Sequence, residues 1–318
     1  MKPRFSDHCT LAFTAVVADV PPVVPSEQRK PLWLIPNLLS LDAPLVAVAW
    51  LYMFAKTWRV DYLPWAAYFS LGLVVWVIYV TDRLLDATLD EGFTRKLEAR
   101  HEFHRKHQRA FRRVALIAAV VAVFLVVTRL PFAIYGIVLG PGGYFGYAII
   151  GALMVGGFFI LSVFSDKGPD EIPHEKNILA GVSFAYGTAM IAFAYTSFDF
   201  WDFLSSRQLI CFAVLCILNI SAIDFWEHAN RSPDPEIKAT DELALTLPLI
   251  LLGAAALVFA AQDHELTTRP FFYAILTGAA LLHILNRNRS RFSMDALRVL
   301  ADVALLVPFV VFMASAQS

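Results

Sequence analysis

The sequence is poor in charged residues and in cysteine. Only 17% of its 318 residues are charged and 58% are hydrophobic, a composition too apolar for an ordinary soluble domain. The three cysteines, Cys9, Cys211 and Cys216, contain no C-x-x-C pair and form no disulfide framework. We interpret Cys211 and Cys216, which fall inside an apolar run, as small core residues. These scarcities exclude a disulfide scaffold and argue against a soluble domain.

Several motifs that carry enzyme chemistry are also missing. The sequence has no glycine-rich phosphate loop, no H-E-x-x-H zinc motif and no nucleophile elbow. The stretch Gly-Pro-Gly-Gly at 140–143 indicates a turn. His101, His104 and His107 recur every third residue and so drift around a helix, which argues against a zinc site.

Long apolar runs, by contrast, recur along the whole chain. We predict an all-α fold, a polytopic membrane protein built as a bundle of about nine transmembrane helices. The predicted spans are 33–54, 64–88, 112–128, 144–164, 178–197, 207–227, 243–261, 270–285 and 295–314. The chain would then divide into a cytosolic N-terminal lead-in, residues 1–31, and a transmembrane helical domain, residues 32–318.

Lysine and arginine are distributed unevenly among the segments that connect these spans. With the N-terminus inside, 19 of the 26 Lys and Arg residues fall in inner segments and 5 in outer ones, as the positive-inside rule requires. We expect an integral protein of the cell inner membrane, with its N-terminus cytosolic and its C-terminus on the outer side. The most basic inner segment, 89–113, would contact anionic lipid or act as a cationic lid that attracts an anionic substrate.

Three aspartates share one helix face at the cytosolic end of the second predicted span. Asp82, Asp86 and Asp90 are four and eight residues apart, which places their carboxylates on one stripe. Stacked like charges repel, so we expect a compensating cation. Mg²⁺ suits this position, because it binds one or two carboxylates together with water and substrate phosphates. The alternative is a solvated acidic helix end paired with Arg83 and Arg95.

A second acidic cluster ends the sixth predicted span. Asp224, Glu227 and His228 lie at i, i+3 and i+4 and share one helix face. Ionisable groups at the membrane edge are costly and tend to mark function, so the two carboxylates are candidate ligands of a second metal. The alternative is an interfacial helix end that faces water. Lys176, where the fifth predicted span enters the membrane, would contact a phosphate or serve as a snorkelling anchor.

The last predicted span contains Arg298 and Asp302, four residues apart in an apolar run. We interpret them as members of a buried ion pair, within the helix or between helices, since neither charge is stable alone in hydrocarbon. Elsewhere the mid-span residues are mostly apolar and polar groups gather at the inner ends. A transporter would show polar residues deep in several spans and often an inverted repeat, so the pattern favours an enzyme or a binding protein.

This pattern resembles the UbiA superfamily of intramembrane prenyltransferases. The likeness runs from about residue 33 onward and combines nine predicted spans, the first acidic motif, the basic loop after it and the acidic end of the sixth span. The family's D/N-x-x-x-D-x-x-x-D motif is matched at all three positions by Asp82, Asp86 and Asp90. Lys176 looks like the first residue of the family's Lys-Arg pair, with Asn177 in place of the arginine.

The second motif departs from the family. Members show an aromatic residue followed by Asp and then a D-x-x-x-D, whereas Asp224, Glu227 and His228 occupy this neighbourhood without that spacing, and Asn219 and Ser221 stand near the expected first aspartate. The second metal's ligand set and catalytic activity itself are therefore left open by the sequence.

The resemblance implies a Mg²⁺-dependent prenyltransferase that moves a polyprenyl group from its diphosphate to a membrane-accessible acceptor. The implied metal ligands are Asp82, Asp86, Asp90, Asp224 and Glu227, and the implied substrate contacts are Lys176, Arg95, Arg83 and His228. We expect the lipid bilayer as surroundings and no nucleic-acid partner. Two alternatives stay open: a catalytically inactive relative that binds a polyprenyl diphosphate or is purely structural, and a transporter.

Overall fold

The computed structural model describes residues 32–89, 99–130, 144–164, 172–197, 199–264 and 266–316. In this part of the chain every regular element is a helix. The predicted lead-in 1–31, the glycine turn 140–143, Asp90 and Arg95 lie outside the described residues, and Asp86 is described in its backbone alone.

Nine of the described helices have 16 residues or more, and each overlaps one predicted span. They are α2 (Asp42–Thr57), α3 (Trp65–Leu89), α5 (Gln108–Arg129), α6 (Tyr144–Phe164), α7 (His174–Phe193), α9 (Arg207–Arg231), α10 (Pro235–Gln262), α11 (Arg269–Arg287) and α12 (Met294–Ser315). The shorter elements are η1 (Leu32–Leu34), α1 (Ile35–Leu38), α4 (Ala99–Lys106), α8 (Phe200–Ser205) and η4 (Arg289–Arg291).

Five of these helices, α3, α5, α9, α10 and α12, are long and apolar enough to cross a membrane within the described residues. The prediction of an all-helical membrane protein is confirmed at this level. The predicted count of about nine spans is not confirmed by the length and hydropathy of the described helices.

Short polar residues set the starts of several helices. The Ser206 side chain accepts a hydrogen bond from the Leu209 amide, and the Ser293 side chain one from the Ala296 amide, at the starts of α9 and α12. Asp234 caps α10 in the same way, and Pro235 takes the first helical position. These caps satisfy amides that have no partner inside the helix.

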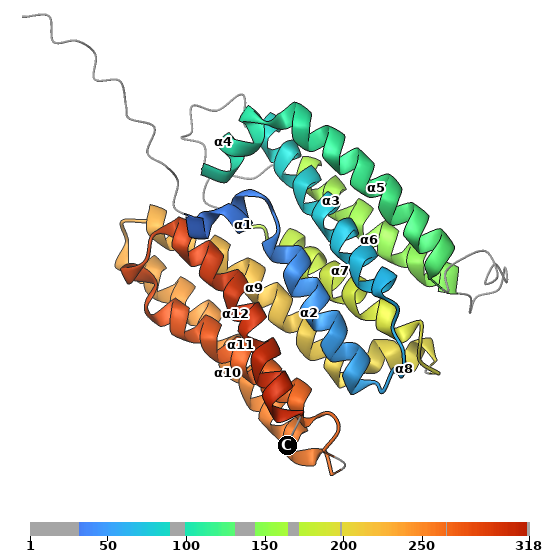
Figure 1. The fold of residues 1–318 in the computed structure, drawn as a ribbon. Coiled ribbons are helices and arrows are strands. Elements are labelled where there is room, and N and C mark those ends of the chain that lie inside the picture. The colour runs from blue at the N-terminus through green and yellow to red at the C-terminus, as the bar shows by residue number, and fades with distance from the viewer. Residues whose placement is uncertain are drawn as a thin grey trace, which may run out of the picture.

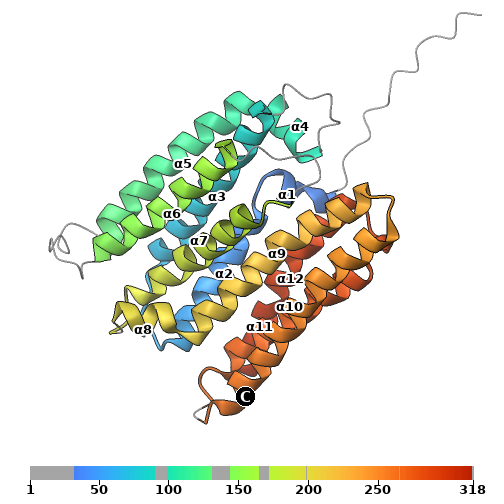
Figure 2. The same ribbon diagram turned by 180° about the vertical axis from the view of Figure 1, so that it is seen from behind.

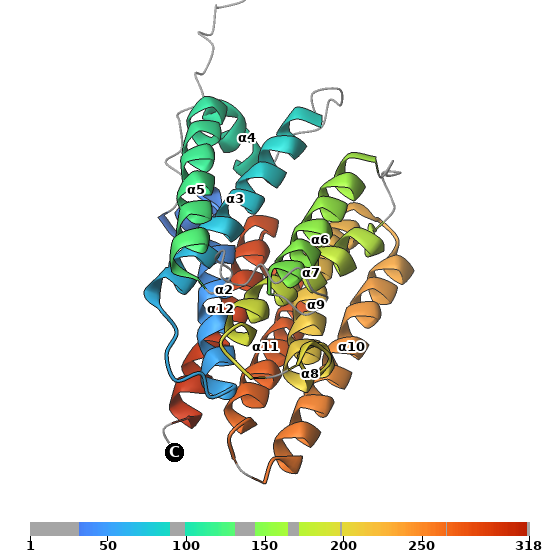
Figure 3. The same cartoon turned by 90° about the vertical axis from the view of Figure 1, so that its right-hand side faces the viewer.

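The long helices run side by side as one bundle (Figure 1). Helices α10, α11 and α12 form one edge, α3 and α5 the other, and α2, α7 and α9 lie between them, as the view from behind also shows (Figure 2). Helix α6 packs on α7, on a different side of the bundle from α3 and α5 (Figure 3). Helices α1 and α4 lie at one end, here called the α4 end, and α8 lies at the other, the α8 end.

An aromatic core fixes α2 against its neighbours. Trp50 is fully buried, stacks on Phe212 of α9 at 4.2 Å between ring centroids and meets Phe271 of α11 edge-on at 5.5 Å. Its indole N–H donates to the carbonyl of Leu305 in α12 at 2.9 Å. Aromatic pairs of this kind contribute beyond their buried area, so α2 is held by three helices at once.

Helices α7 and α9 are in close contact at Gly181. A Cβ atom at this position would lie 2.6 Å from the backbone nitrogen of Ile217. Small residues permit such contact between membrane helices. Cys211 and Cys216 of α9 are buried and free, which confirms their interpretation as core residues.

Helix α4 is docked by a buried histidine. The His104 ring is fully buried, stacks on Phe111 at 4.3 Å and brings Nε2 to 3.4 Å from the Ser40 hydroxyl. The cations that follow it are exposed and do not line the candidate cavity described below: Arg105, Lys106, Arg109, Arg112 and Arg113. This placement fits contact with an anionic surface better than a lid over the cavity.

Candidate functional site

A cavity of about 360 Å³ lies at the α4 end and is walled by α1, α2, α3, α6, α7, α9 and α12. Its polar lining residues are Asn37, Asp42, Tyr79, Asp82, Arg83, Lys176, Asn177, Ser183, Asn219, Asp224, Glu227, Arg298 and Asp302. Its apolar lining residues include Val75, Ile78, Val155, Phe158, Phe184, Ile220 and Ile223. The cavity therefore has both charged lining residues and a wall of apolar side chains.

A second hollow, of about 770 Å³, lies at the α8 end among the ends of α2, α11 and α12. Lys56, Arg59 and Arg269 line it, and no carboxylate is among its described lining residues. Because metal and phosphate chemistry needs both signs of charge, the smaller cavity is the better candidate.

The first acidic motif faces the predicted phosphate-binding lysine. The Asp82 carboxylate on α3 and the Lys176 ammonium on α7 are 3.8 Å apart, with side chains 24% and 17% exposed. The ammonium also lies over the ring of Phe158 on α6, 5.1 Å from its centroid, a cation–π geometry. Lys176 thus points into the cavity, as a phosphate contact requires.

The carboxylates of the second cluster are bound by other helices. Asn177 at the start of α7 donates from Nδ2 to Oδ2 of Asp224 at 2.7 Å. Arg298 on α12 donates from Nη2 to Oε1 of Glu227 at 2.6 Å, and its Nη1 lies 3.4 Å from Oδ1 of Asp295. The Arg298 side chain is only 5% exposed. Arg298, predicted together with Asp302 to belong to a buried ion pair, thus pairs between helices with Glu227, whose side chain is 25% exposed. Asp302 lines the same cavity.

Arg83 holds the turn that precedes α2. Its buried guanidinium donates to the backbone carbonyl of Asn37 in α1. The Asn37 amide donates to Oδ2 of Asp42 at 2.6 Å, and Oδ1 of Asp42 accepts from the Ala43 amide at 3.0 Å. Arg83 lines the cavity, a position compatible with its predicted substrate contact. The hydrogen bond described here connects α3 to α1.

Four polar lining residues were missed from the sequence: Asn37, Asp42, Tyr79 and Ser183. The Ser183 hydroxyl oxygen is buried and has no hydrogen-bond partner among the described residues. Such a group is costly unless something binds it. Its signal in the sequence is a serine inside the small-residue stretch of α7, which is easily interpreted as packing. Asn219, noted near the second motif, donates to the carbonyl of Ala301 at 2.8 Å.

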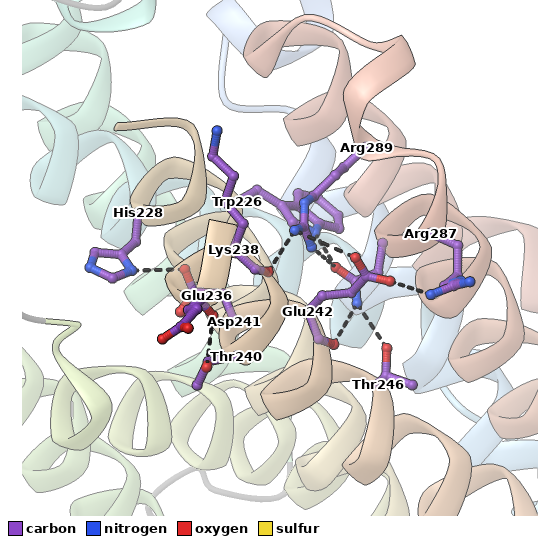
Figure 4. Close-up of polar contacts among 11 residues, drawn as sticks. Trp226, His228, Glu236, Lys238, Thr240, Asp241, Glu242, Thr246, Arg287 and Arg289 are labelled. Carbon is purple, nitrogen blue, oxygen red and sulfur yellow. Dashed lines mark hydrogen bonds and ion pairs between the residues drawn. The ribbon is translucent and has the colours of Figure 1, made fainter. Parts of the chain in front are cut away.

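His228 is not among the cavity lining residues. Its Nδ1 lies 2.8 Å from Oδ2 of Asp241 on α10 (Figure 4). Nearby, Asn286 accepts from the Trp226 indole at 2.9 Å and donates to the carbonyl of Glu242 at 3.0 Å. The placement of His228 supports a role in joining α9 to α10 and does not support its predicted substrate contact.

A second set of ion pairs lies near these contacts and involves Glu242 of α10 (Figure 4). Arg287 pairs with the carboxylate of Glu242, and Nη2 of Arg289 lies 3.6 Å from its other oxygen (Figure 4). Arg289 also donates to the carbonyl of Lys238 at 2.8 Å. These bonds tie α10 to the α11–α12 connection and lie apart from the cavity lining.

The donor set of the cavity suits a magnesium ion that is bound together with phosphate. Among the described residues, no group of three His, Cys, Asp or Glu side chains is placed to hold a metal. The lining carboxylates come from several helices: Asp42, Asp82, Asp224, Glu227 and Asp302. Mg²⁺ needs one or two such oxygens when substrate phosphates and water complete its shell. A closed metal cage made by the described side chains alone does not fit.

Comparison of the chain with models of protein families, with curated proteins and with solved structures found no match. The resemblance to the UbiA superfamily stays a prediction from the sequence pattern.

Proposed function

We propose that this chain is a Mg²⁺-dependent intramembrane prenyltransferase, which moves a polyprenyl group from its diphosphate to a membrane-accessible acceptor. The observation that supports this best is the meeting of Asp82, Lys176 and Asp224 from three helices in one cavity with an apolar wall. A substrate with a charged head and a hydrocarbon tail matches this division.

The diphosphate would lie at the charged end of the cavity. Lys176 faces Asp82 there and would take part of the negative charge of the leaving group. The prenyl chain would lie against Val75, Phe184 and Ile220 and continue between helices toward lipid. The bond to be broken would then lie between the charged groups and the apolar wall of the cavity.

Magnesium would be held by Asp82 with the other two aspartates of the first motif, Asp86 and Asp90. When bound, it supplies neutralisation of the departing diphosphate. The chain's own part is to position the substrate and to shield the allylic cation that develops as the C–O bond breaks. The ring of Phe184, which lines the cavity, would stabilise that cation.

The proposal includes a topology. All nine long helices would cross the inner membrane, with the α4 end in the cytosol and the C-terminus on the outer side. The uneven distribution of Lys and Arg supports this orientation.

A second candidate function is diphosphate binding without turnover. One observation favours it: one oxygen of each carboxylate of the second acidic cluster already accepts a hydrogen bond, from Asn177 or Arg298, in the region where the family's second motif is expected.

The test is thermal unfolding of the purified full chain in detergent, with a non-hydrolysable farnesyl or geranylgeranyl diphosphate analogue, with and without Mg²⁺. A ligand that binds only the folded state stabilises it by about 2.7 kcal/mol at a hundredfold excess over Kd. We expect a shift that needs both the analogue and Mg²⁺ and is lost in Asp86→Asn. The matched control Asp202→Asn changes an exposed aspartate of α8 and should keep the shift.

The absence of a shift with donors of any chain length would contradict donor binding. If the shift is observed, release of diphosphate from the natural donor would indicate an enzyme, and binding without release would indicate a binding protein.

A further inference from the structure

The Glu227–Arg298 pair forms part of the cavity wall. A guanidinium stays charged at any physiological pH, and the Arg298 side chain is 5% exposed. Its Nη2 donates to Glu227 at 2.6 Å, the short distance of a charge-assisted hydrogen bond. Moving Arg298 away would leave the carboxylate of Glu227, whose side chain is 25% exposed, without this partner and would cost the charge-assisted hydrogen bond.

Asp224 is engaged in the same region. Its Oδ2 accepts from the Asn177 amide at 2.7 Å. A divalent cation bound between Asp224 and Glu227 would lie beside the fixed positive charge of Arg298, whose side chain is 5% exposed. Like charges this close repel each other. The second acidic cluster is therefore poorly suited to a metal ion.

We propose that the second acidic cluster binds no metal and that Arg298 contacts the diphosphate in place of a second divalent cation. This inference rests on the proposed function. Glu227 is then the anchor of Arg298 and not a metal ligand. Arg298 lines the same cavity as Asp82 and Lys176. The planar guanidinium matches phosphate oxygens in geometry and in charge. It can therefore bind the leaving group directly, whereas a metal ion would need carboxylate ligands from the protein.

The first experiment counts metal ions. The full chain in detergent, saturated with the geranylgeranyl diphosphate analogue, is titrated with Mn²⁺, and free Mn²⁺ is read from its electron paramagnetic resonance signal. We expect one Mn²⁺ bound per chain. Two bound ions would overturn the proposal.

The second experiment separates the anchor from a ligand. Glu227→Gln should still bind one Mn²⁺ with a Kd within about threefold of wild type, while analogue affinity falls because Arg298 loses its anchor. Loss of Mn²⁺ binding in Glu227→Gln would show that Glu227 is a metal ligand and would also overturn the proposal.

The third experiment tests Arg298 itself. Arg298→Gln should weaken analogue binding by about tenfold or more, the scale of a lost charge-assisted hydrogen bond, with the Mn²⁺ count unchanged. Arg298→Gln leaves the Glu227 carboxylate without this partner. The double variant Glu227→Gln/Arg298→Gln therefore removes both charges, and its unfolding transition shows whether it folds. Arg112→Gln, which changes an exposed cation outside the cavity lining, is the control.

Unchanged analogue affinity in the folded double variant would contradict the role of Arg298. A wild-type protein that binds no analogue would instead refute the proposed function, and this inference with it. A wild type that binds the analogue with two Mn²⁺ would refute the inference alone.

Discussion

Single residues in the cavity are held mainly by bonds that cross from one helix to another. Asp82 pairs with Lys176, Asp224 accepts from Asn177, and Glu227 accepts from Arg298. The Asp82–Lys176 pair, at 3.8 Å, is longer than the other two contacts, at 2.7 and 2.6 Å. Because charge-assisted bonds strengthen as they shorten, Lys176 is the charged group that a ligand can most easily recruit.

Lys176→Gln should therefore affect binding more than stability. We expect the free energy of unfolding to change by about 1 kcal/mol or less, as for other partly exposed ion pairs. The Kd of the diphosphate analogue should rise by about tenfold. Titration of the analogue followed by thermal unfolding checks both values. Lys238→Gln, an exposed lysine of α10, is the control, and equal weakening in both variants would argue against a specific contact.

Ser183→Ala removes a buried hydroxyl that has no described partner. The variant should be as stable as wild type or more stable by about 1 kcal/mol, since the desolvation cost disappears. Thr188→Val is the matched control, because the Thr188 hydroxyl is also buried without a described partner but lies outside the cavity lining. Only Ser183→Ala should alter analogue affinity. A change in both variants would indicate an indirect effect through α7.

At the scale of elements, the contact between α7 and α9 positions Lys176 on α7 relative to Asp224 and Glu227 on α9. Gly181→Ala would bring a Cβ within 2.6 Å of the Ile217 backbone, so α7 must move away from α9. We expect a loss of about 1–3 kcal/mol in unfolding free energy, typical of overpacking, together with weaker analogue binding. Chemical or thermal unfolding in detergent measures the loss.

Gly187→Ala on the same helix is the control for this substitution. A Cβ at Gly187 would meet nothing within 4 Å, so the variant should be stabilised by about 0.5–1 kcal/mol. Equal destabilisation of both variants would contradict close packing at Gly181 as the cause.

The element bounds show what the sequence can and cannot predict. The predicted span 144–164 matches α6, whereas the span predicted at 178–197 corresponds to α7 at His174–Phe193. Lys176 and Asn177 were interpreted as the polar membrane edge, but the helix continues through them. Similarly, α10 begins at Pro235, ahead of the span predicted at 243–261, because Asp234 caps the helix and Pro235 takes its first position.

The candidate site was predictable in its residue types but not in its pairings. Asp82, Lys176, Asp224 and Glu227 were singled out from the sequence, and all four line one cavity. The partner of Glu227 is Arg298, 71 residues away, and such a pairing depends on how α9 and α12 pack. Local spacing carries no information about it.

At the scale of the whole molecule, the uneven Lys and Arg content of the connecting segments predicts which end faces the cytosol. Helix α10 offers a direct test, since Ala239 and Gln262 are exposed near its two ends. In a chain whose three cysteines are replaced by alanine, Gln262→Cys should react with a membrane-impermeant maleimide in intact cells. Ala239→Cys should react only after the membrane is permeabilised. The reverse pattern would contradict the proposed orientation, and labelling of both in intact cells would contradict a span by α10.

The two sides of the cavity differ in how firmly they are closed. On one side α7, α9 and α12 are joined by contacts of 2.6 and 2.7 Å. On the other, α3 meets α7 across the 3.8 Å pair of Asp82 and Lys176, and α6 contributes the ring of Phe158. The second side is the easier one to widen. A molecule dissolved in the bilayer would enter there sideways, with its tail still in lipid, and would reach the charged groups without passing through bulk water.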